Sequence, residues 1–102
     1  MTAPDHTTTY VDHARHLLTQ RHPDLADEPV LLDHYALLVH AKAGATTPGD
    51  VHDAWSLWRS RSRPDHRSII PFNQLAHDVQ RLDQPYVDAI RAAAAALGIG
   101  RR

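Results

Sequence analysis

Apolar side chains recur along the chain at intervals of three and four residues, which is the spacing of one face of an α-helix. The first such stripe consists of Tyr10, Ala14, Leu17 and Leu18. Thr8 or Thr9 is placed to cap this helix. Pro23 is placed to end it, because proline lacks a backbone donor and disfavours helical geometry in the residue before it. The pattern predicts a first helix over about residues 10–22.

Two further helices are predicted in the middle of the chain. Pro29 suits the first position of a second helix, and Gly44 suits its end. The apolar positions of this helix cover more than half of its circumference: Leu31, Leu32, Tyr35, Leu38 and Val39. A third helix begins with Thr47 as its cap and runs to about Ser60, before Pro64. Its apolar stripe consists of Val51, Trp55 and Trp58.

The remainder predicts an irregular loop over residues 61–72, one or two short helical turns, and a last helix. Asp83 is expected to cap that helix and Gly98 to end it. No alternating strand pattern competes, so the sequence predicts an all-α fold, a compact bundle of about four main helices. The expected core consists of Leu17, Leu31, Tyr35, Leu38, Val51, Trp55, Phe72, Leu75, Leu82, Tyr86 and Ile90.

A length of 102 residues corresponds to one domain, here expected over residues 1–102 with frayed tails at 1–6 and 99–102. The chain has no cysteine, which excludes disulfides, thiolate zinc sites and cysteine nucleophiles. Its start lacks the basic and apolar pattern of a signal peptide, and no apolar run approaches the roughly 20 residues needed to span a bilayer. We therefore expect a cytoplasmic protein with no membrane partner.

Charge is distributed unevenly along the chain. Residues 1–50 hold three basic and seven acidic side chains, and residues 51–102 hold eight basic and five acidic ones, so the second half suits an anionic partner better. Four arginines lie close together: Arg59, Arg61, Arg63 and Arg67. They either complement the negative end of the third helix dipole or form an anion site. A pI near 6.7 and the lack of a long basic stripe argue against a nucleic-acid partner.

Catalytic patterns are missing from the sequence. None of the serines lies in a GxSxG elbow, and the four glycines form no phosphate-binding loop. His13 and His16 are spaced as two metal ligands, but no HExxH motif and no third ligand accompany them. We expect a protein that is not an enzyme, with no catalytic residues, no cofactor and no metal site.

Residues 47–92 resemble the repeat domain named after the ryanodine receptor, which also occurs in small bacterial and phage proteins. The matching elements are "HDAW" (52–55), His66, "PFNQL" (71–75) and "QRLD" (80–83). The insert that this family usually carries between the tryptophan helix and the histidine is shortened here to "SLWRSRSRPD". The resemblance implies a ligand-binding module, proposed in prokaryotic members to sense nucleotide-derived ligands, or a module for contacts between domains.

The candidate binding site consists of His52, Trp55, Arg59, His66 and Arg67. The loop after Pro64 must return toward the core because Phe72 and Leu75 need burial, and this return would complete a cleft with an aromatic wall and a cationic rim. The cleft would suit an anionic, nucleotide-like ligand. In a second interpretation, His52 and His66 bond the backbone of the loop and hold it down. An alternative function is protein–protein interaction or self-association through leftover apolar surface.

Overall fold

The computed structural model describes residues 8–100, and the predicted helices form close to their predicted positions. The main helices are α1 (Tyr10–Arg21), α2 (Pro29–Ala41), α3 (Pro48–Ser62) and α5 (Gln84–Ala96). The 3₁₀ turns η2 (Pro23–Asp27), η3 (Ala43–Ala45), η4 (Phe72–Gln74) and η5 (Arg81–Asp83) and the short helix α4 (His77–Gln80) connect them. Residues 8–100 contain no strand, so the all-α prediction with four main helices is confirmed.

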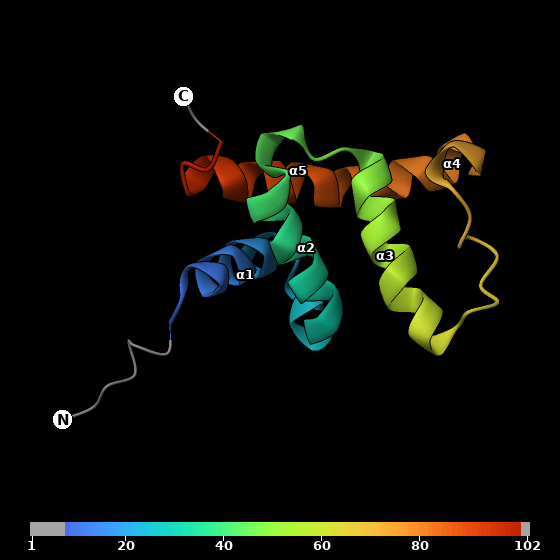
Figure 1. Ribbon diagram of the computed structural model, residues 1–102, viewed down its shortest axis with the longest axis horizontal. Coiled ribbons are helices and arrows are strands. Elements are labelled where there is room, and N and C mark those ends of the chain that lie inside the picture. The colour runs from blue at the N-terminus through green and yellow to red at the C-terminus, as the bar shows by residue number, and fades with distance from the viewer. Residues whose placement is uncertain (1–7, 101–102) are drawn as a thin grey trace.

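The main helices pack around one core, with α5 lying across α2 and α3 (Figure 1). Figure 1 shows α2 and α3 leaving the connection at residues 42–47 and diverging, with α5 lying across the ends that this connection joins. α1 packs against both α2 and α5. The ends of α2 and α3 that lie away from α5 are therefore separated from each other. No helix in the described part of the chain is long and apolar enough to cross a membrane.

The core lies where α1, α2, α3 and α5 meet. Its largest fully buried side chains are Leu18, Leu25, Ile90, Val39, Val51 and Val87. The small alanines of α5 lie in the same cluster, so the helix backbone approaches its neighbours closely. The predicted core residues Leu31, Tyr35, Val51, Leu75 and Ile90 are buried. Leu17, Leu38 and Tyr86 are partly buried against the core cluster.

Three predictions about the core are wrong or incomplete. Leu82 is 67% exposed, because the backbone at Leu75 is extended and a new helix begins at His77, which breaks the assumed helical spacing. Trp55 and Phe72 are only partly buried and lie outside the core cluster. Trp58 is the tryptophan that packs against the core. On α1, Tyr10 is exposed and therefore does not belong to the buried apolar face that the sequence predicts.

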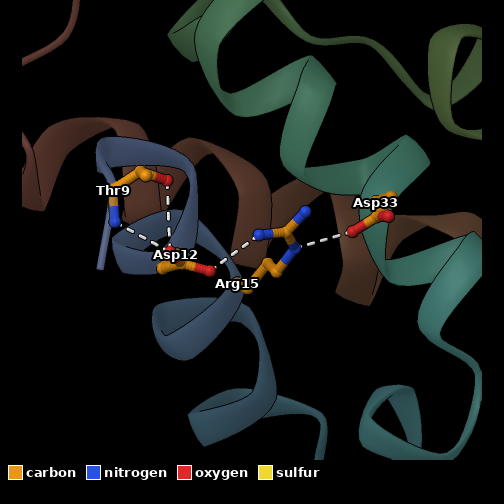
Figure 2. Close-up of polar contacts among 4 residues, drawn as sticks. All are labelled: Thr9, Asp12, Arg15 and Asp33. Atoms are coloured by element: carbon orange, nitrogen blue, oxygen red, sulfur yellow. Dashed lines mark hydrogen bonds and ion pairs between the residues drawn. The ribbon is translucent and has the colours of Figure 1, made fainter. Parts of the chain in front are cut away.

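Two of the three predicted N-terminal caps, at Thr9 and Thr47, form. The Thr47 hydroxyl accepts a hydrogen bond from the Asp50 backbone, and the Asp50 carboxylate accepts one from the Thr47 backbone. At α1, the backbone N–H of Thr9 donates to the Asp12 carboxylate over 2.7 Å, and this bond is the main cause that lowers the pKa of Asp12. Figure 2 shows the Arg15 guanidinium donating hydrogen bonds to the carboxylates of both Asp12 and Asp33. The bond to Asp33 links α1 to α2.

The helix ends differ from prediction at α2 and agree at α5. Gly98 has a φ of 72°, and the backbone N–H groups of Gly98 and Ile99 donate to Ala95 and Ala94, so α5 ends in a Schellman motif. Ile99 packs against the core and is not frayed; residues 1–6 and 101–102 lie outside the described residues. α2 ends before Gly44, and Ala43 takes the left-handed conformation instead, with a φ of 50°.

Candidate functional site

A cleft of about 630 Å³ lies between the separated ends of α2 and α3. The start of α2 with η2 forms one wall, the stretch of α3 from His52 to Arg59 forms the other together with the loop after it, and η5 with the start of α5 closes the back. Four of the five predicted site residues line it: His52, Trp55, Arg59 and His66. Arg67 does not line the cleft: its side chain is exposed on the loop, although its neighbours His66 and Ser68 both line the cleft.

His52 is 3% exposed and joins three parts of the chain. Its Nε2 lies 2.7 Å from the carbonyl oxygen of Ile70, so this nitrogen carries a proton and donates it to the loop. Its Nδ1 lies 3.9 Å from Asp83, which forms an ion pair when the ring is protonated on both nitrogens. The backbone hydrogen bond that the second interpretation expects of His52 is therefore present.

His66 makes a hydrogen bond within the loop itself. Nδ1 of this ring accepts a hydrogen bond from the backbone of Ser68 over 3.1 Å. The ring meets Trp55 edge-on, with 5.1 Å between the ring centroids, and the His52 ring stacks on Trp55 at 5.7 Å. Trp55 is therefore held between two imidazoles at the wall of the cleft, which explains why it is not a core residue.

Arg59 is the guanidinium that lines the cleft. Its guanidinium carbon lies 4.3 Å from the centre of the Trp58 ring, in cation–π contact. Its Nε is buried and has no hydrogen-bond partner among the described residues. Arg59 and Arg61 lie in the last turn of α3, where positive charge also complements the helix dipole. Arg59 can therefore complement the dipole of α3 and line the cleft at the same time.

Carboxylates are more numerous in the cleft than cations. Four line it: Asp24, Asp27, Glu28 and Asp83. Burial raises the pKa of Asp83, and the nearby charge of His52 partly opposes this shift. Asp83 occupies the predicted cap position of α5, but its side chain makes no capping hydrogen bond and faces His52 instead. The sequence therefore located Asp83 correctly and misassigned the role of its side chain.

Two tyrosines complete the back of the cleft. Tyr35 and Tyr86 lie with ring centroids 5.5 Å apart, and the Tyr86 hydroxyl donates to Asp24 over 3.2 Å. Burial is the main cause that raises the pKa of both phenols, and neighbouring carboxylates add to it. At Tyr35 the upward shift of the pKa is large, because this side chain is almost fully buried.

The Tyr35→Phe variant should resist alkaline unfolding better than the wild type. The pKa of Tyr35 is raised in the folded state, so the unfolded chain loses this proton first as pH rises. Stability from the neutral phenol is then fully present below about pH 10 and is lost above it, by up to about 1.4 kcal/mol per pH unit. Urea unfolding at increasing alkaline pH measures this. Parallel pH curves for wild type and variant would contradict the prediction.

Ser56, His52 and Asp83 form a line that invites comparison with a catalytic triad. The Ser56 hydroxyl lies 3.3 Å from Nε2 of His52. The same Nε2 already donates to the Ile70 carbonyl, so it has no free lone pair with which to accept a proton from serine. Ser56 also lies in the middle of α3 rather than at a strained turn. These three residues therefore lack the hydrogen-bond arrangement of a catalytic triad.

Metal ligation finds no support in the described part of the chain. Residues 8–100 contain no group of three or more histidine, aspartate or glutamate side chains placed to hold a metal ion. His13 and His16, the pair spaced suitably on α1, are both exposed.

Sequence reasoning missed the acidic wall and the tyrosines of the cleft. Asp27 and Glu28 precede Pro29 and were interpretable only as a helix start. The sequence predicts Tyr35 and Tyr86 in the core. Tyr35 is buried and Tyr86 partly buried, but this prediction says nothing of the cleft that they border. No local pattern connects these residues to α3, because they meet it only through long-range packing.

The fold and the cleft define a small all-α protein with an aromatic, acid-rimmed cleft between two diverging helices. The chain belongs to the family described as a domain of unknown function (DUF7701), whose model matches residues 9–95. The match begins at the Thr9 cap and includes α1 and α2, for which the ryanodine-type resemblance has no counterpart. No curated protein and no solved structure matches the chain.

Proposed function

We propose that the protein is a non-enzymatic binding module that holds a small planar ligand in the cleft between α2 and α3. The observation that carries this proposal is the convergence of Trp55, His52, His66 and Arg59 on one cleft of about 630 Å³. Ligand pockets typically measure roughly 300–1,000 Å³ and combine aromatic walls with a few polar groups. The absence of cysteine from the sequence fits a cytoplasmic setting, which belongs to the same proposal.

A nucleotide-like ligand is the sequence-based prediction within this proposal, and the ryanodine-type resemblance supports it. Arg59 is the group that would pair with a phosphate, since a guanidinium fork matches phosphate oxygens and its Nε lacks a partner among the described residues. Trp55 would supply the stacking surface. Arg67 has no part in this site, because it does not line the cleft.

Titration with nucleotides and other planar compounds, followed by tryptophan fluorescence and checked by calorimetry, tests the proposal. Both tryptophans line the cleft, so an occupant should change their emission. For an anionic ligand, Arg59→Ala should weaken binding about tenfold or more, whereas Arg67→Ala, the matched control, should leave it unchanged. A flat response to the whole panel in both signals contradicts the proposal.

A second candidate function is protein–protein interaction or self-association. It is favoured by two apolar side chains on α2, Val30 and Leu37, which are exposed although this helix is otherwise central to the core. Sedimentation over a range of concentrations tests self-association directly. A flat ligand response together with a stable dimer would favour this function over ligand binding.

A further inference from the structure

The charge of the cleft differs from what an anionic ligand requires. Four carboxylates and one guanidinium line it, so with neutral histidines its formal charge is −3. Two of the carboxylates already have partners: Asp24 accepts from Tyr86, and Asp83 faces His52. All four carboxylates contribute to this negative charge, and Asp27 and Glu28 are the two whose side chains have no partner among the described residues.

Asp27 and Glu28 line the exposed edge of the cleft, and their carboxylate oxygens are free to accept hydrogen bonds. Within residues 8–100 their side chains make no hydrogen bond and no ion pair. Arg59, on the opposite wall, makes no ion pair with them, since the described residues contain no contact of 4.0 Å or less between its guanidinium and a carboxylate. An occupant between the two walls would meet unpaired negative charge on the α2 side.

The aromatic wall suits the same kind of occupant. The face of an aromatic ring attracts cations, and this attraction grows as water is excluded. The protein itself places a planar cation on an indole here, because the Arg59 guanidinium lies over Trp58. Tyr35, Tyr86 and Trp55 border the rest of the cleft. Ring faces and carboxylates both favour a planar group that carries positive charge.

We infer that the ligand of this cleft presents a planar cation, of the amidinium or guanidinium class, toward Asp27 and Glu28. This inference rests on the proposed function and adds the chemical class of the ligand. A planar cation would interact favourably with both the carboxylates and the faces of the aromatic rings. A planar anion would gain only Arg59 and would be repelled by the acidic wall. A multiply charged nucleotide is therefore disfavoured relative to a planar cation.

Three compounds of nearly equal shape separate these possibilities: benzamidine, benzamide and benzoate, which are cationic, neutral and anionic at neutral pH. The probe is the pair of indole N–H signals of Trp55 and Trp58 in the ¹⁵N-labelled full chain. We expect benzamidine to bind about fivefold tighter than benzoate at low salt, with benzamide between them, because two exposed carboxylates each contribute a modest ion-pair term. Added salt should narrow the difference.

The double variant Asp27→Asn with Glu28→Gln should bring benzamidine and benzoate to nearly equal affinity. The matched control is Asp53→Asn with Asp78→Asn, which removes the same charge from exposed positions outside the cleft and should retain most of the preference. Circular dichroism checks that both variants fold.

The outcomes distinguish this inference from the proposed function. A preference for benzamidine that only the cleft variant loses supports the inference. Equal binding, a preference for benzoate, or loss of the preference in the control variant overturns the inference, while the binding function stands. If none of the three compounds shifts the indole signals and nucleotides also fail to bind, the proposed function falls together with the inference.

Discussion

The Leu18→Ala variant should lose about 3 kcal/mol of unfolding free energy. Leu18 is 0% exposed and lies on the face of α1 that packs against α2 and α5. Truncation removes the transfer energy of the buried carbons and leaves a cavity that helices on both sides hold open, and such changes cost about 2–5 kcal/mol. A domain of this size has a total stability of about 5–15 kcal/mol, so the loss is a large fraction of the whole.

Urea unfolding followed by circular dichroism measures this loss. The matched control is Leu37→Ala, which makes the same chemical change on α2 at a side chain that is 65% exposed. Its stability should change by no more than about 0.5 kcal/mol. Equal losses in the two variants would show that α1 is not packed on the core as described.

The helices could be predicted because the residues that begin and end them are neighbours in the sequence. Thr47, Pro48 and Asp50 supply a cap, a first position and a capping box within four residues, and the structure forms all three. Gly98 supplies a left-handed residue where α5 must end. α2 shows the limit of such reasoning, since Ala43 rather than Gly44 adopts the left-handed turn.

The cleft could be predicted only on the side formed by α3 and the loop that follows it. His52, Trp55 and Arg59 share one helix, so their common face follows from helical spacing alone. The return of the loop to His52 follows from the need to bury the segment around Leu75. The opposite wall depends on the angle at which α2 diverges from α3, and that angle is set by long-range packing against α5.

The net charge of each half of the chain was a poor guide to the charge of the cleft. The second half carries the excess of arginines, but Arg61, Arg63 and Arg67 are exposed on the end of α3 and the loop. The acidic first half contributes Asp24, Asp27 and Glu28 to the cleft instead. A fold that joins two halves of opposite charge at one site can reverse the local sign, and the sequence alone does not show which groups face inward.

The His52→Ala variant should lose about 2–4 kcal/mol of unfolding free energy, although it removes a polar side chain. Two buried or partly buried groups lose their partner together: the Ile70 carbonyl oxygen and the Asp83 carboxylate, whose side chain is 14% exposed. Loss of the hydrogen bond costs about 1 kcal/mol at the part-buried Ile70 carbonyl, and the carboxylate of Asp83 loses the nearby positive charge that the ring carries when it is protonated. The loop that returns to α3 through Ile70 would also lose its anchor.

Adding Asp83→Asn to His52→Ala tests this account of the loss. The amide carries no charge, so it removes the uncompensated carboxylate and should recover part of the stability that His52→Ala costs. His66→Ala is the matched histidine control: it removes a single hydrogen bond, from Ser68, at a partly exposed ring and should cost only about 1 kcal/mol. Urea unfolding compares the four proteins. If His52→Ala and His66→Ala lose equal stability, or if Asp83→Asn makes the His52→Ala protein less stable still, His52 is not the buried link between α3, the loop and Asp83.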